Sequence, residues 1–210
     1  MPTISTLSLF IAATLALLVV PGPAVVYIVT RTVTQGRTAG LVSVLGIHVG
    51  SIFYVLVTSL GLSALLLAST MAFQIVKWLG VAYLIWLGVQ KLWLRKTEDG
   101  SVTEPPPMST WRIFAQGVLV NVLNPKTLVF FVAFLPQFVD PARGAVAGQL
   151  LFFGIGFIVL GILSDGTYAL LASVLSGRLR RTATARRRLD LSSGLVYILL
   201  GAVAATVSQT

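Results

Sequence analysis

Cysteine is absent from this chain of 210 residues. Its absence excludes disulfide frameworks, thiol redox relays, cysteine nucleophiles and metal sites built on thiolates. Charged residues are also scarce: they make up 10% of the chain, whereas soluble domains carry about 25%. The composition therefore argues against an ordinary soluble enzyme.

Hydrophobic residues, by contrast, make up 56% of the chain, and the mean hydropathy is +0.94. A helix needs about 20 apolar residues to cross a bilayer, so the chain has room for about six. The long apolar segments are residues 7–30, 40–67, 72–94, 113–139, 147–176 and 190–207. They predict an all-α, multi-pass integral membrane protein with six transmembrane helices.

The basic residues predict how these helices are oriented. Twelve of the 15 Lys and Arg residues fall within 31–37, 91–112 and 178–188, and only Lys77 and Arg143 fall on the opposite side. Because cytoplasmic loops carry an excess of Lys and Arg, the three basic loops are predicted to be cytoplasmic and both termini outside. The net charge of +9 then reflects topology and contact with anionic membrane lipid. No nucleic-acid partner is expected.

The chain divides into two related halves. Residues 1–95 and 111–210 each hold three apolar segments, and a polar, proline-containing cytoplasmic linker, residues 96–110, separates them. The third segment of each half carries a similar phrase, from Gly80 to Gly88 and from Gly194 to Gly201. An odd number of spans turns the second half upside down, so the pattern predicts two inverted three-helix repeats. In secondary transporters, interrupted helices in corresponding positions of such repeats point to the binding site.

The first helix of each half is interrupted in this way. Pro21, Gly22 and Pro23 interrupt one, and Asn124 with Pro125 interrupts the other. Proline removes a backbone donor, and in a bilayer the freed groups must be satisfied by protein, water or ligand. A packing kink is the alternative interpretation. In the second half, Asn as N-cap and Pro as first helical residue predict a new helix N-terminus, which suits a substrate carboxylate.

Two charged residues lie clearly in the middle of predicted spans, Lys126 and Asp165. A charge costs at least about 2.5–3.5 kcal/mol at mid-bilayer, so both are candidate functional residues. Their opposite signs suggest an ion pair, which is either a static helix contact or part of a site. Lys126 would then meet a substrate carboxylate, and Asp165 a substrate amine or a coupling proton. Tyr168 shares a helix face with Asp165 and is a candidate hydrogen-bond partner for the carboxylate or the substrate.

His48 is the only histidine in the chain. It lies between Gly46 and Gly50, whose spacing predicts close helix packing. The histidine falls on the other side of the helix from these glycines, and it is a second candidate for proton coupling. One histidine, few carboxylates and no cysteine make a poor metal site. Neither a metal nor a cofactor is expected.

Several phrases carry a family resemblance, in one order from about residue 5 to residue 205. They are Pro21-Gly22-Pro23, Gly36-Arg37-Thr38-Ala39-Gly40, the run from Lys77 to Gly88, Asn124-Pro125-Lys126, Phe134-Leu135-Pro136-Gln137-Phe138, and Asp165 with Tyr168. On these residues the chain resembles the LysE/RhtB amino-acid exporters of bacteria. The resemblance implies a proton-driven efflux protein of the inner membrane, with amino acids or close derivatives as substrates and a homodimer as a candidate assembly.

The prediction is thus a secondary active exporter working by alternating access, with amino acids, protons and lipid as its partners. Three alternatives stay open. The first is a transporter of an inorganic ion or other small solute with the same architecture. The second is an intramembrane hydrolase using Ser164, Asp165 and His48, although a triad requires mutual geometry and no nucleophile motif is present. The third is a purely structural membrane protein.

Overall fold

The computed structural model describes residues 2–62 and 107–179 of the chain. It also describes five single positions between these ranges, Met71, Ile75, Trp78, Ala82 and Val89. Outside the described residues lie most of the predicted third helix, the sixth helix and most of the matched phrases beginning at Gly80 and Gly194. Most of the linker and of the arginine-rich stretch 178–188 also lies outside them.

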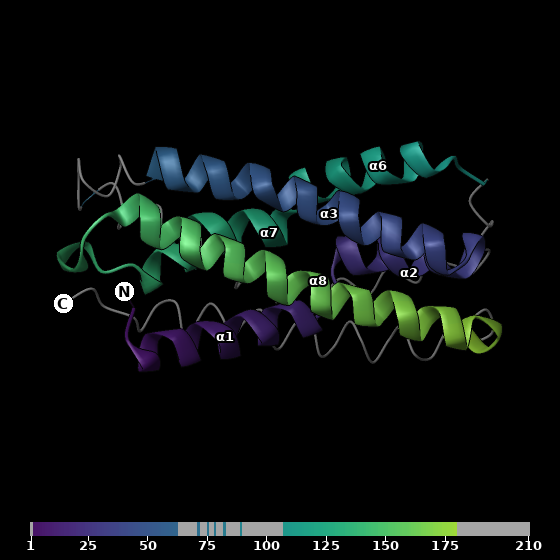
Figure 1. Ribbon diagram of the computed structural model, residues 1–210, viewed down its shortest axis with the longest axis horizontal. Coiled ribbons are helices and arrows are strands. Elements are labelled where there is room, and N and C mark those ends of the chain that lie inside the picture. The colour runs from purple at the N-terminus through teal and green to yellow at the C-terminus, as the bar shows by residue number, and fades with distance from the viewer. Residues whose placement is uncertain are drawn as a thin grey trace.

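Helices and short turns make up the described ranges, which contain no strand (Figure 1). The α-helices are α1 (Ile4–Val19), α2 (Pro23–Gln35), α3 (Arg37–Val57), α6 (Thr110–Val122), α7 (Pro125–Val129) and α8 (Val146–Leu179). The π-helical turns η1 (Thr58–Leu62) and η2 (Phe130–Phe134) continue α3 and α7, and two 3-10 turns follow, η3 (Leu135–Phe138) and η4 (Pro141–Arg143). This all-helical architecture agrees with the predicted fold class.

Two continuous helices in the described ranges are long and apolar enough to cross a membrane, over Arg37–Gly61 and Val146–Ser176. Two bent helix pairs pass the same test when each pair is counted as one span. α1 and α2 meet at 53°, and α6 meets the segment Pro125–Phe138 at 48°. Both predicted interruptions are therefore confirmed as real breaks in helical spans, and the described residues supply up to four spans.

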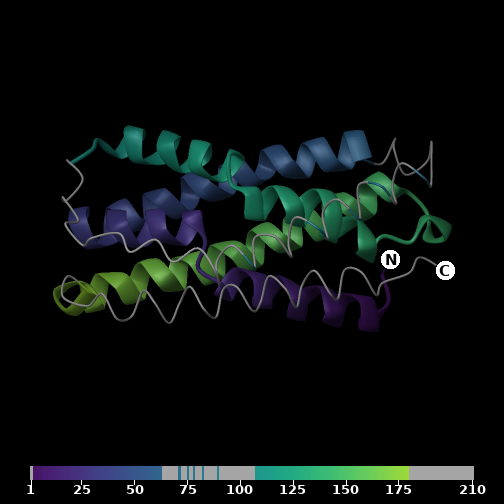
Figure 2. The same cartoon turned by 180° about the vertical axis from the view of Figure 1, so that it is seen from behind.

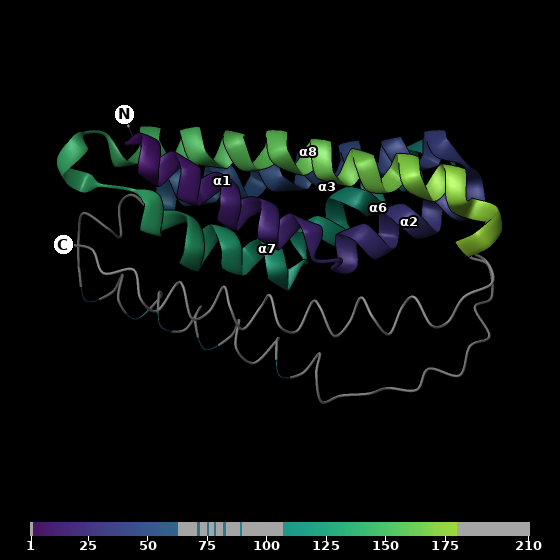
Figure 3. The same ribbon diagram turned by 90° about the horizontal axis from the view of Figure 1, so that it is seen from below.

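α3 and α8 run along the whole length of the bundle, and the broken spans lie beside them (Figures 1 and 2). Both breaks fall near the middle of the long axis (Figure 3). The N-terminus and the loop 139–145 lie at one end. The α2–α3 turn, the start of α6 and the end of α8 lie at the other (Figure 1). The described parts of the three basic loops thus share one end of the molecule.

Glycines bring α3 and α6 into close contact. A Cβ added at Gly46 would collide with the backbone carbonyl of Phe114, and one at Gly50 would lie 2.8 Å from the carbonyl oxygen of Val118. Gly117 on α6 allows the reciprocal approach to α3. The spacing of Gly46 and Gly50 therefore serves helix packing, as the sequence indicates.

The two ends of the bundle are packed with different chemistry. Between α1, the α7–η3 segment and α8, phenylalanine rings fill the core, with centroids as close as 4.5 Å for Phe130 and Phe157. The cluster consists of Phe10, Phe130, Phe131, Phe134, Phe138, Phe153 and Phe157. These rings close the interior toward the end that carries the N-terminus.

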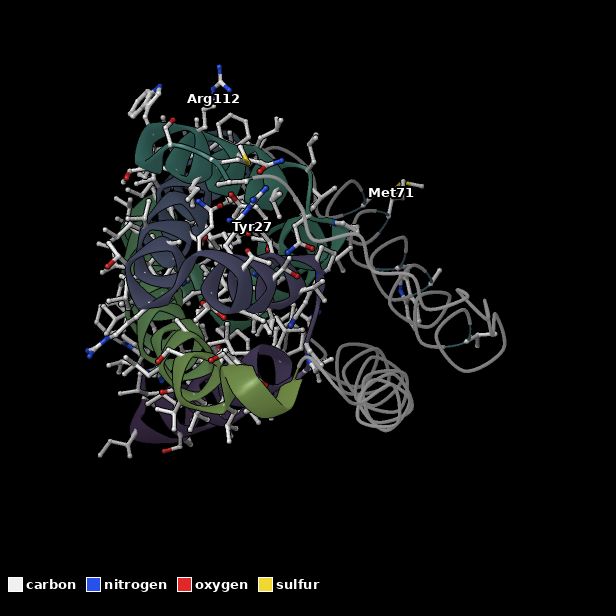
Figure 4. The ribbon with its side chains drawn as sticks, turned by 90° about the vertical axis from the view of Figure 1, so that its right-hand side faces the viewer. Tyr27, Met71 and Arg112 are labelled. Carbon is white, nitrogen blue, oxygen red and sulfur yellow. The ribbon has the colours of Figure 1, made fainter. Side chains whose placement is uncertain are left out.

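Polar side chains join α2 to α6 at the opposite end. The Tyr27 hydroxyl donates to the Ile113 carbonyl at 2.8 Å. The buried Arg31 guanidinium donates to Gln35 at 3.1 Å and to Gln116 at 3.2 Å. Figure 4 views this end, with Tyr27 inside the bundle and the exposed Arg112 projecting outward. Hydrogen bonds therefore close the interior on the side of the basic loops.

Candidate functional site

The break between α1 and α2 frees backbone carbonyls near the middle of the bundle. In a continuous helix each N–H would bond the carbonyl four residues earlier, but Pro21 and Pro23 have no N–H. Their absence frees the carbonyls of Leu17 and Val19. The Val20 N–H turns back and donates to the Leu17 carbonyl at 3.2 Å, so one freed carbonyl is satisfied within the chain segment itself.

Two further carbonyls at the end of α1 are satisfied from distant segments. The Tyr168 hydroxyl on α8 donates to Val19 at 2.7 Å. The Lys126 ammonium, at the start of α7, donates to Val20 at 2.5 Å. A cation is favourable here because a helix C-terminus carries partial negative charge. Lys126 therefore bridges the two broken spans.

The second break is capped as the sequence predicts. Asn124 is the N-cap of α7, and its side-chain oxygen accepts from the Lys126 backbone N–H at 3.1 Å. Pro125 occupies the first turn of the helix. The Asn124 N–H donates to the Asn121 carbonyl at 2.9 Å, which is the carbonyl that Pro125 leaves without a donor.

A tyrosine from the other half of the chain also caps this second break. The hydroxyl of Tyr54 on α3 donates to the carbonyl of Val122 at the end of α6. The first break receives Tyr168 from the second half in the same way. Each broken span thus depends on a hydroxyl from the continuous helix of the opposite half.

His48 and Asp165 meet across α3 and α8. The His48 Nε2 lies 3.1 Å from the Asp165 Oδ2, and each residue is only 4% exposed. The ring lies against Gly161, where a Cβ would overlap it. The second ring nitrogen, Nδ1, is buried and has no hydrogen-bond partner. His48 points to α8 and the two glycines around it point to α6, which confirms that they occupy different faces.

The predicted ion pair between Lys126 and Asp165 is wrong. The ammonium bonds the Val20 carbonyl, and the carboxylate bonds His48 instead. Tyr168 does not bond Asp165 either, because its hydroxyl is used by Val19. Both corrections have one physical reason: the broken helix supplies backbone acceptors, and these take the donors of Lys126 and Tyr168.

The two charged groups nevertheless line one cavity, which encloses about 30 Å³. Its polar lining comprises His48, Ser51, Asn121, Asn124, Lys126, Thr127 and Asp165, and its other lining residues are Leu17, Leu18, Gly22, Ala24, Val25, Ile47 and Phe157. Of the predicted site residues, the structure brings Gly22, Asn124, Lys126, Asp165 and His48 to this cavity. Pro21, Pro23, Pro125 and Tyr168 are not among its lining residues. The prolines lie at the two helix breaks, and the Tyr168 hydroxyl bonds the Val19 carbonyl.

Sequence reasoning missed a polar chain that joins three helices beside the cavity. The Asn121 amide donates to the Ser51 hydroxyl at 3.0 Å, and the Thr127 hydroxyl donates to the Asn121 oxygen at 2.9 Å. All three side chains are buried. Asn121 carries the detectable signal, since an amide in an apolar span requires partners inside the protein.

The geometry also bears on the hydrolase alternative. A catalytic serine would have to contact the histidine nitrogen opposite the carboxylate. That nitrogen, Nδ1 of His48, has no partner, so Ser164 does not complete a triad. Among the residues that the structure describes, no group of three His, Cys, Asp or Glu side chains could hold a metal ion.

Long apolar helices that enclose a charged, polar interior define an integral membrane protein. The family model of the LysE type translocators matches residues 15–208. The chain belongs to this family, as its sequence motifs predict. No solved structure matches it significantly.

Individual relatives cover most of the chain. An uncharacterized membrane protein of Vibrio cholerae is 32% identical over 186 residues, covering 89% of each chain. The homoserine/homoserine lactone efflux protein of Salmonella typhimurium is 31% identical over 186 residues, with the same coverage. The leucine efflux protein of Salmonella choleraesuis is 26% identical over 131 residues, covering 62% of each chain.

Proposed function

We propose that this protein is a secondary active exporter of amino acids or close derivatives across the bacterial inner membrane. The names of its efflux relatives support the substrate class. One structural observation carries the proposal: Lys126 and Asp165 line the same buried cavity without pairing with each other. The cation bonds the Val20 carbonyl and the anion bonds His48. The two are therefore suited to bind the opposite charges of a zwitterion.

A zwitterionic substrate would complete both partial interactions. Its carboxylate would approach Lys126, whose ammonium is now bound to a neutral carbonyl. A carboxylate adds the attraction between two opposite unit charges, which is large in a low-dielectric interior, whereas the carbonyl offers only a dipole. Its ammonium would approach Asp165. No direct Lys126–Asp165 contact has to be broken first, and the substrate enters the attraction that already acts between the two charges. Pro21, Gly22, Pro23, Asn124 and Pro125 would hold the backbone of the site open, with Tyr168 supporting the end of α1.

The proposal includes the full architecture predicted from the sequence. Six spans would form two inverted three-helix repeats, residues 1–95 and 111–210, joined by the linker 96–110, with both termini outside. The reciprocal tyrosine caps support this arrangement, since each half completes the other's broken span. The shared end of the described basic loops supports the orientation.

Transport would proceed by alternating access. The cavity has room for about two water molecules, so the helices must move apart to admit an amino acid. Phenylalanine packing closes one side, and the hydrogen bonds of Tyr27 and Arg31 close the other. Opening one side at a time would carry the substrate outward. Proton uptake from outside at Asp165, or at its partner His48, would release the substrate amine.

Flux measurements in proteoliposomes test the proposal. A proton gradient should drive transport of a few members of a panel of labelled amino acids. Lys126→Gln and Asp165→Asn should each reduce that flux at least tenfold, because each removes one charge-assisted interaction of about 1.5–3 kcal/mol. Arg112→Gln and Asp140→Asn serve as matched controls, since these side chains are exposed or half-exposed and lie outside the cavity.

Two outcomes would contradict the proposal. Full activity of both cavity variants would remove the charged site from the mechanism. Absence of flux for every amino acid, with folded protein and an intact gradient, would replace the substrate class by an inorganic ion or another small solute.

A further inference from the structure

We propose that the coupling proton is carried on Nδ1 of His48, while Asp165 stays ionised and holds the ring. In this scheme Gly161 is a positioning residue that makes room for the imidazole. The inference rests on the proposed exporter function and assigns an atom to its proton step.

Contacts with Asp165 and Gly161 fix the orientation of the imidazole ring. His48 Nε2 lies 3.1 Å from the Asp165 carboxylate, and Gly161 lies against the edge of the ring that carries Cε1. An ionised carboxylate only accepts hydrogen bonds, so Nε2 must carry a proton and donate it. In the neutral ring the remaining nitrogen, Nδ1, is then a lone-pair acceptor.

This acceptor has no donor. Nδ1 of His48 is buried without a hydrogen-bond partner, although most buried polar atoms in proteins have one. A buried histidine that serves only to hold helices together would normally use both nitrogens. An unpartnered nitrogen beside a polar cavity is suited to accept a proton.

The charge balance explains how such a proton would be coupled to export. With neutral His48, the His48–Asp165 pair carries one negative charge and can bind a substrate ammonium. When a hydronium ion from the outer solution gives its proton to Nδ1, its O–H bond breaks, an N–H bond forms, water leaves and the pair becomes neutral. The ammonium then loses its counter-charge. Proton and substrate amine therefore compete for a single negative charge, which gives exchange in opposite directions.

Within residues 2–62 and 107–179, the surroundings of His48 contain few other titratable groups. Asp165 is the only buried carboxylate within residues 2–62 and 107–179. Tyr27 and Arg31 bond α6 toward the basic end, and α1 has no titratable side chain. The groups on elements around α3 are Asp165 and Tyr168 on α8, Lys126 on α7, Tyr27 and Arg31 on α2, and the exposed Arg112 on α6. None of these forms a hydrogen bond with Nδ1.

His48→Gln tests the proton step separately from substrate binding. A glutamine amide can donate to Asp165 as Nε2 does, but it cannot take up a proton. The variant should lose at least tenfold more of its gradient-driven transport than of its exchange of labelled for unlabelled substrate without a gradient. Gradient-driven transport at the wild-type rate would overturn the inference, as would an equal loss of both activities in a folded variant. If the wild-type protein itself shows no exchange, the proposed function fails first.

Gly161→Ala provides a matched test of positioning. The added methyl group would displace the imidazole, so gradient-driven transport should fall while exchange persists. Gly166→Ala on the same helix is the control, because a Cβ there has nothing within 4 Å. Equal effects of the two substitutions would overturn the role of Gly161.

Nitrogen NMR on the wild-type protein gives a readout that needs no transport. The chain has one histidine, so a protein purified with a histidine-free tag and labelled in its imidazole gives a single pair of signals. We expect the Nε2–H tautomer at high pH and a protonated Nδ1 at low pH, with the titration displaced in Asp165→Asn. An Nδ1–H tautomer, or a ring that never titrates in the folded state, would overturn the inference.

Discussion

The Tyr168 hydroxyl donates to the Val19 carbonyl at 2.7 Å, across 149 positions of the chain. It replaces the N–H that Pro23 cannot supply. Tyr54 does the same for Val122 at the other break. The two breaks are therefore closed, hydrogen-bonded structures, each completed by a side chain from a neighbouring continuous helix.

Removing these hydroxyls should destabilise the protein. Tyr168→Phe and Tyr54→Phe each leave a carbonyl at a helix break without its donor, at a cost of about 1–3 kcal/mol where the carbonyl is out of reach of water. The larger effect is expected for Tyr54, which is buried, whereas Tyr168 is only partly buried. Thermal unfolding of the purified proteins in detergent measures both effects. Unchanged unfolding temperatures would show that water or lipid headgroups satisfy the carbonyls.

The N-cap of α7 gives a second prediction. Asn124→Ala should reduce the free energy of unfolding by about 0.5–2 kcal/mol, because the Lys126 N–H loses its acceptor. Asn124→Ser should recover most of that loss, since serine is also a good N-cap. Denaturant unfolding of the three proteins compares them directly. A serine variant as unstable as the alanine variant would mean that Asn124 acts otherwise than as a cap.

Close packing of α3 on α6 gives a third prediction. Gly46→Ala should cost about 1–3 kcal/mol of stability, because the added methyl group meets the rigid backbone of Phe114 rather than a flexible side chain. Gly166→Ala should cost far less, since open space surrounds that position. The difference between their unfolding temperatures is the measurement. Equal temperatures would contradict the close contact between α3 and α6.

The absence of cysteine makes the orientation testable. Thr38→Cys and Ala142→Cys each place one thiol at an exposed position, and these positions lie at opposite ends of the bundle. In intact cells an impermeable maleimide should label the variant at 142 and leave the variant at 38 unlabelled until the cells are opened. The reverse pattern would place the termini in the cytoplasm.

Features that depend on local chemistry could be predicted from the sequence. Pro21, Pro23 and Pro125 lack a backbone donor wherever they occur, so the breaks follow from the residues themselves. The cap at Asn124 is equally local. These features locate the middle of the site before any tertiary contact is known.

The partners of the charged groups could not be predicted in the same way. His48 and Asp165 are 117 positions apart, and their contact depends on the space that Gly161 leaves on another helix. The partner of Lys126 is a backbone carbonyl, and a carbonyl has no signature in a sequence. The side-chain charges alone favour a contact between Lys126 and Asp165, but in the structure Lys126 bonds the Val20 carbonyl instead.

The cap of Val19 by Tyr168 also has a consequence for biosynthesis. The ribosome makes the end of α1 early, but the hydroxyl that completes it belongs to a helix made much later. Until α8 inserts, the first span must keep its break near water, the translocon or lipid headgroups. The bent helix pair at the start of the chain therefore reaches its final structure only after α8 has been made.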